Sequence, residues 1–133
     1  MIERAIHEIL ADTGIADAVA LSVLLTPERI VTGINHDRDL PYGSISVEGD
    51  LAEYRTNSRA MRSHRVRFQI WHDNHAAGAA IRDAVEKLFE NKTFETTTES
   101  IKLTRHENSF AIQEPDGTWQ FTIDLQTKSA QKG

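Results

Sequence analysis

Hydrophobic and polar residues alternate along this chain with a helical period in some segments. Over residues 2–10 the apolar side chains fall on one helical face, and Gly14 then ends the helix. A longer helix begins after the capping pair Asp73-Asn74 and runs to Glu90. Its apolar stripe consists of Ala77, Ala80, Ile81, Ala84, Val85, Leu88 and Phe89. The apolar run over residues 16–25 fits either a short helix or a buried strand, because periodicity does not separate the two at this length.

Other segments alternate with the period of two that is typical of strands. Alternation over residues 42–48 and 63–72 predicts two strands that pair as a hairpin. Further strands are predicted over residues 101–105 and 109–113, and from Trp119 to Gln126 after a turn at residues 114–117, whereas Ile30-Val31 suggests only a short strand. Residues 50–62 are polar and Arg-rich, which predicts a long hairpin loop.

These elements predict an α+β fold, an antiparallel sheet of about four strands with its helices packed on one face. The expected order is a helix, a short helix or strand, two strands, a helix and two strands. We expect a single domain over residues 1–127 and a flexible tail over residues 128–133.

The amino-acid composition excludes several kinds of site and of protein. The 133 residues include 15 Lys and Arg, 20 Asp and Glu, and no Cys, for a formal net charge of -5. The lack of cysteine excludes disulfides, a cysteine zinc site and a thiol nucleophile. Since no apolar run approaches the roughly 18 residues of a membrane span, we expect a soluble protein that stays where it is made.

The charge is unevenly distributed. A third of the basic charge lies between residues 55 and 67, where no acid occurs, whereas residues 86–99 contain four Glu against two Lys. The basic residues are Arg55, Arg59, Arg62, Arg65 and Arg67. They could form a solvated surface, bind nucleic acid, or meet the acidic surface of a neighbouring subunit in a ring. Trp71 projects opposite Val66 and indicates either an interface or a second core face covered by the first helix.

Catalytic and metal signatures are weak. Neither Ser44 nor Ser46 lies in a Gly-x-Ser-x-Gly context, and no Gly-rich phosphate loop is present. The candidate metal ligands are His64, His72, Asp73 and His75, but helix capping by Asp73 or Asn74 explains that cluster better. We therefore expect no enzyme, no metal and no cofactor.

Several strings, in their order along the chain, resemble one family. They are Arg29-Ile30-Val31, the Leu40-Pro41-Tyr42 step, the strand from Arg65 to Trp71, the Ala-rich helix after it and the closing pair of strands, which together reach about Leu125. The chain resembles the tail completion (tail terminator, or head-tail joining) proteins of long-tailed bacteriophages and prophages.

The resemblance implies a virion protein without catalytic residues. It would assemble as a homo-oligomeric ring, in a template-dependent way, and would join the tail tube to the head connector. Arg55, Arg59, Arg62, Arg65, Arg67 and Trp71 would contact a neighbouring subunit or the DNA in the channel. The expected location is the virion, and the host cytoplasm during assembly. The alternative that the residues leave open is a small nucleic-acid-binding module that uses the basic hairpin.

Overall fold

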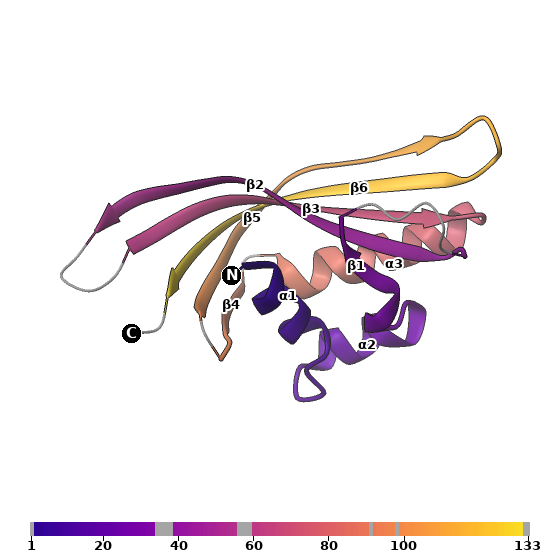
Figure 1. Cartoon of the computed structure of the whole chain (residues 1–133). Helices are drawn as coiled ribbons and strands as arrows, with labels where there is room; N and C mark the ends of the chain where they lie inside the picture. Colours follow the sequence, from indigo (N-terminus) through magenta and orange to yellow (C-terminus); the bar gives the residue numbers. More distant parts are fainter. Residues whose placement is uncertain (1, 34–38, 56–59, 91, 98, 132–133) are drawn as a thin grey trace.

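The chain forms three helices and six strands in the computed structural model, which describes residues 2–33, 39–55, 60–90, 92–97 and 99–131 (Figure 1). The helices are α1 (Ile2–Leu10), α2 (Ala16–Leu24) and α3 (His75–Phe89), and a 3-10 turn spans Pro27–Arg29. The strands are β1 (Ile30–Thr32), β2 (Tyr42–Arg55), β3 (Ala60–His72), β4 (Lys92–Glu95), β5 (Glu99–Gln113) and β6 (Trp119–Gln131). The predicted helices at the two amphipathic segments are present as α1 and α3, and the ambiguous apolar run is helix α2.

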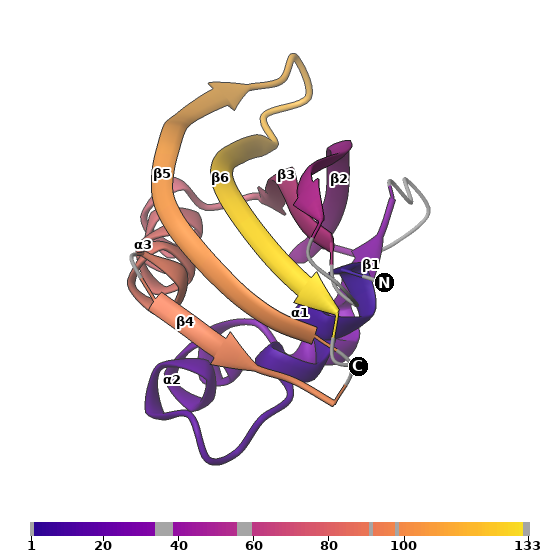
Figure 2. The same cartoon turned by 90° about the vertical axis from the view of Figure 1, so that its left-hand side faces the viewer.

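All six strands join one curled sheet in the order β1-β2-β3-β6-β5-β4 (Figure 2). Each neighbouring pair is antiparallel except β1 and β2, which are parallel. The prediction of an antiparallel sheet of about four strands with helices on one face is therefore wrong. The two edge strands, β1 and β4, have three and four residues, and so short a segment carries too little alternation to reveal its partner or its direction.

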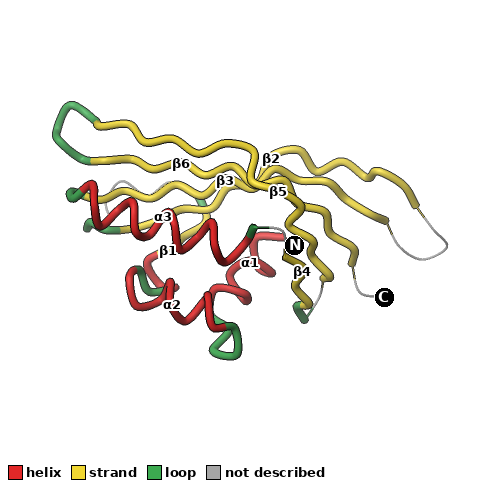
Figure 3. The backbone as a smooth tube through the Cα atoms, turned by 180° about the vertical axis from the view of Figure 1, so that it is seen from behind, coloured by secondary structure: helices red, strands yellow, loops and turns green. Residues whose placement is uncertain are grey.

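The helices form two layers rather than one. α3 packs on β3 and β6, and α1 packs on β2, whereas α2 lies against α3 and α1 on the side away from the sheet (Figure 3). The core between α3 and the sheet contains Ile81, Val85 and Leu88 from the helix and Phe68 and Phe121 from the strands. We call the side of the sheet that meets α1 and α3 the inner face, and the opposite side the outer face.

The long strands extend beyond the helices. β3 has 13 residues and α3 has 15, so the strand spans about 43 Å at its rise per residue and the helix only about 22 Å. The sheet continues past the helical layer as an arm, on the left in Figure 1. Most of the hairpin loop predicted over residues 50–62 belongs to this arm as strand, because β2 runs to Arg55 and β3 begins at Ala60. Residues 56–59 lie outside the described residues.

Irregular pairing explains why the predicted strands are shorter than β2 and β5. β2 shifts register against β3 between Glu48 and Leu51 and again between Ala52 and Tyr54. β5 is one strand where two were predicted, and it shifts register twice against β6, between Leu103 and Asn108. Each bulge breaks the period of two on which the sequence pattern depends.

The end of the chain also joins the sheet. Of the tail predicted over residues 128–133, residues 128–131 continue β6 and Ser129 is buried, while residues 132–133 lie outside the described residues. Among the residues described, no helix has the length and hydropathy to cross a membrane.

Candidate functional site

The outer face is built from rows of side chains that the register sets side by side. One row is Tyr42, Trp71, Gln120 and Ile112, and the next is Ser44, Gln69, Thr122 and Phe110. These residues alternate with the core residues of the inner face, as the pleat of a strand requires. The outer face therefore carries mostly polar side chains, with aromatic and aliphatic residues at one end, and Tyr42, Ser44, Trp71 and Thr122 on it are buried.

Trp71 is buried on this outer face. It is 4% exposed and stacks on Tyr42, with ring centroids 4.8 Å apart and an interplanar angle of 15°. The first helix does not cover it, because α1 belongs to the inner-face core. Burial, with a smaller contribution from the Glu114 carboxylate, raises the pKa of Tyr42 above its ordinary value of 10.0. In a single chain Trp71 thus presents almost no surface to a neighbour.

The arginines are in different environments. Arg67 donates from Nε and an Nη to both carboxylate oxygens of Asp124, at 2.8 and 3.2 Å, and the Asp124 side chain is nearly buried. Arg65, two residues earlier on the same face, is exposed and pairs in register with Glu48 and Gln126. Arg67 is therefore committed to an internal bidentate pair, whereas Arg65 reaches the surface.

Two of the other three arginines, Arg55 and Arg62, lie toward the end of the arm that β2 and β3 form. The backbone of Arg55 pairs with that of Ala60 at the end of the hairpin ladder. The backbone of Arg62 pairs with that of Ala52 on one side and that of Ser129 on the other. Arg59 lies outside the described residues. Their assignment as contacts to a neighbour or to DNA stays a prediction.

The four candidate metal ligands do not come together. His64 is buried on the inner face, with Nε2 3.1 Å from Ser129 Oγ, and His75 packs edge-on against Trp119 at 4.5 Å between ring centroids. His72 Nδ1 accepts a hydrogen bond from the Asn74 amide at 3.0 Å and lies 3.1 Å from the Asp73 carboxylate. Within the described part of the chain, no three His, Asp or Glu side chains are placed to hold a metal ion.

The capping explanation for this segment is confirmed. The Asn74 side chain accepts from the Ala77 amide at 2.9 Å at the start of α3. The residues at this junction are explained by the helix that they begin.

The acidic residues of the segment 86–99 lie on more than one element. Glu90 caps the C-terminal end of α3, whereas Glu95 lies on β4, where its carboxylate accepts from Ser100 Oγ at 2.8 Å. Lys92 between them pairs with Asp17 of α2.

Two groups of exposed apolar side chains were not found from the sequence. The α2 patch consists of Val19, Val23 and Leu24, and Val23 is 81% exposed. The β5 patch consists of Phe110 and Ile112, which are 37% and 52% exposed. The sequence shows α2 only as an apolar run, and the strand pattern at β5 does not say which of its faces is covered. The sequence signal for both patches is the presence of more apolar residues in these segments than one covered face needs.

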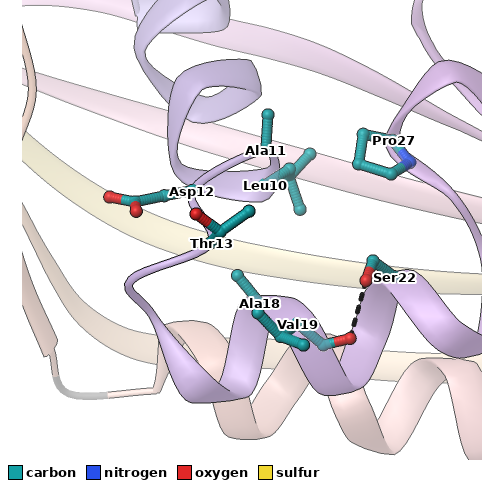
Figure 4. A pocket seen from close by; sticks show the side chains of 8 residues that line it. All are labelled: Leu10, Ala11, Asp12, Thr13, Ala18, Val19, Ser22 and Pro27. Atoms are coloured by element: carbon teal, nitrogen blue, oxygen red, sulfur yellow. Dashed lines mark hydrogen bonds between the residues drawn. The ribbon is translucent and has the colours of Figure 1, made fainter.

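An open pocket of about 200 Å³ lies beside the α2 patch (Figure 4). The Ser22 hydroxyl at its wall donates to the Val19 carbonyl at 2.7 Å, so this hydroxyl already has a partner. The pocket is formed by the end of α1, the link to α2, α2 itself and the 3-10 turn. Its lining residues are Leu10, Ala11, Asp12, Thr13, Ala18, Val19, Ser22 and Pro27.

The fold is shared with a chain of known structure. A scan against protein-family models finds no match, and a search of curated proteins finds none either. Among solved structures, the chain is similar to a chain from the virion of a native gene transfer agent (GTA) particle, with a TM-score of 0.62 and 14% sequence identity. The similarity covers 99% of this chain and 95% of that chain. At this identity the likeness establishes a common fold over the whole length of both chains.

Proposed function

We propose that this chain is a structural subunit of a phage or prophage virion, a tail completion or head-tail joining protein that assembles as a ring at the end of the tail. The observation that carries the proposal is the full-length likeness in fold to a chain of a phage-like virion particle. It agrees with the resemblance of the sequence strings to tail completion proteins, which rests on independent grounds.

The side chains support a structural rather than a catalytic role. Each of the three candidate histidines already has a local contact: His64 with the buried Ser129 hydroxyl, His72 with the Asn74 amide and His75, at the start of α3, with the Trp119 ring. By contrast, apolar side chains are exposed on α2 and on β5, and exposed apolar groups of this kind mark contacts between proteins. The proposed partners are further copies of this chain, the tail tube and the head connector, and the proposed location is the virion.

A second candidate is a nucleic-acid-binding module, which the exposed Arg65 on the outer face favours. It would require affinity that falls steeply with salt, because each neutralised phosphate releases counterions. The bidentate Arg67–Asp124 pair removes one of the five arginines from this role, and the net charge of -5 opposes DNA at long range. We therefore rank DNA as a channel contact below assembly.

The experiment measures mass by light scattering after size-exclusion chromatography, first alone and then with tail tubes of the same virion. We expect a ring, or association with the tube end that electron microscopy shows as a terminal disc. The variant Arg65→Glu should weaken association while its thermal unfolding stays unchanged, because an exposed charge contributes little to stability. The charge-preserving Arg65→Lys is the matched control. A chain that stays monomeric and also ignores tail tubes would rule the proposal out.

A further inference from the structure

We propose that neighbouring copies of this chain meet head to tail, with the β5 patch of one copy packed on the α2 patch and pocket of the next. The inference rests on the ring function proposed above and adds the two surfaces that form the contact.

α2 is apolar on both its covered and its uncovered sides. Ala18 and Leu21 are buried toward the rest of the molecule, while Val19 and Val23, one turn apart, are exposed. A surface helix of a soluble protein normally shows a polar outer side. An outer side of valine and leucine is therefore expected to be covered by another protein surface.

The β5 patch is accessible because it lies on an uncovered strand edge. β4 pairs only with residues 100–103 of β5, so the segment from Ser109 to Gln113 has β6 on one side and no described strand on the other. Phe110 and Ile112 alternate onto the outer face of this segment, beside Thr122 and Gln120. An apolar segment at a free sheet edge is a typical site of pairing with another chain.

Among the residues whose side-chain exposure the structure describes, the two patches together contain every exposed large apolar side chain except Leu40. α2 lies on the side of α1 and α3 that faces away from the sheet, whereas Phe110 and Ile112 belong to the outer face of the sheet, so the two patches are on opposite sides of one chain (Figures 1 and 3). Contact between two different surfaces is heterologous, and such contacts generate rings when the rotation closes.

The size of the pocket favours the β5 patch of a second copy as its occupant. A cavity of about 150 Å³ holds a benzene ring, so the pocket of about 200 Å³ beside Val19 has room for the phenyl ring of Phe110. Acidic Asp12 and Glu28 are exposed at the pocket and next to it, so a symmetric contact of α2 with α2 would bring acid against acid. Arg65 and Lys128 share the outer face with Phe110 but lie further along the sheet, and Glu114 and Asp116 follow the β5 patch directly in the chain. The size of the pocket, rather than charge, therefore selects Phe110 as its occupant.

The test uses the lack of cysteine in the natural chain. Full-length chains that carry Val19→Cys are mixed with chains that carry Phe110→Cys and a tag, so that the two variants differ in size on a gel. The mixture is oxidised alone and in the presence of tail tubes. The control replaces Phe110→Cys with Asp73→Cys, because the Asp73 side chain is 77% exposed but lies at the junction of β3 and α3. Both test positions are exposed, so circular dichroism melts should match those of the unmodified chain.

We expect at least a tenfold excess of the 19–110 disulfide over the 19–73 disulfide, and a ladder beyond the dimer for a chain carrying both Val19→Cys and Phe110→Cys. Three results would each overturn the inference. The 19–110 disulfide could be no more abundant than the control, or the 19–19 and 110–110 disulfides could dominate. The Val19→Cys chain could also link mainly to a different virion protein. If the unmodified chain forms rings on tails while the 19–110 link stays at control level, the inference fails and the proposed function stands. If the chain ignores tails, the proposed function fails, whatever the disulfides show.

Discussion

Gly78 of α3 packs against the Phe121 ring of β6 with no room for a side chain, and Gly78→Ala should destabilise the fold. A Cβ at this position would lie 2.2 Å from Phe121 Cε2, 2.9 Å from Cζ and 3.0 Å from Cδ2. Carbon atoms pack at about 3.5–4.0 Å, so the ring or the helix must move by about 1.3 Å. Phe121 is fully buried and also contacts the ring of His75 and the guanidinium of Arg82, so it has little room to move.

The size of the effect follows from two opposing contributions. Alanine gains about 1 kcal/mol over glycine in a helix interior, whereas overpacking a rigid core costs about 1–3 kcal/mol and occasionally more. With three ring atoms at or inside 3.0 Å, the cost lies at the upper end, and the net loss should be about 2 kcal/mol. For a domain of this size that corresponds to a fall in Tm of roughly 8 °C.

Urea or thermal unfolding followed by circular dichroism measures this loss. Ala80→Gly, at an exposed position of the same helix, is the matched control and should cost only the propensity, about 1 kcal/mol. In a Phe121→Leu background the penalty of Gly78→Ala should shrink, because the clashing ring atoms are gone. A Gly78→Ala protein as stable as the natural chain, or more stable, would refute the close approach of α3 to β6.

Two further outcomes concern the outer face. Arg67→Met leaves the nearly buried Asp124 carboxylate without its bidentate partner and should lower the free energy of unfolding in urea by about 2 kcal/mol. The double variant Arg67→Met/Asp124→Leu should recover part of this loss, because no unpaired carboxylate is left. Equal losses in the single and the double variant would contradict the reasoning. The pKa of Tyr42 is raised by burial and by Glu114, so the folded chain keeps this proton longer than the unfolded chain. The contribution of Tyr42 to the free energy of unfolding is fully present below about pH 10 and is lost as the pH rises through the folded-state pKa. Tyr42→Phe should therefore flatten the fall in stability at alkaline pH. An unchanged fall in this variant would show that Tyr42 is not its cause.

The regular parts of this fold follow from the sequence because local periodicity and burial agree there. The stripe over residues 77–89 predicts α3, and the alternation from Trp119 predicts β6, because each packs one face on the core. Alternation fails where the sheet leaves the helical layer and where bulges shift the register, as in β2 and β5. Pairing partners at the edges depend on long-range contacts that no local pattern records.

The candidate sites were predictable to a smaller extent. The sequence shows five clustered arginines, but not that Arg67 is bound to a carboxylate 57 residues away. Likewise it places Trp71 opposite the core face without showing that Tyr42 lies against it. The exposed apolar patches depend on which sides of α2 and β5 the rest of the chain covers, and this is a property of the assembled fold.

The position of β6 has a consequence for synthesis of the protein. β6 is the last element of the chain, yet it lies in the middle of the sheet, between β3 and β5. At about 5–20 residues per second, the ribosome needs roughly 3–12 s to add the 59 residues between the end of β3 at His72 and the end of β6 at Gln131. During that interval the β2–β3 hairpin exists without its central neighbour, so the sheet can close only after β6 has been synthesised. A truncation within residues 119–131 would therefore remove part of a central strand.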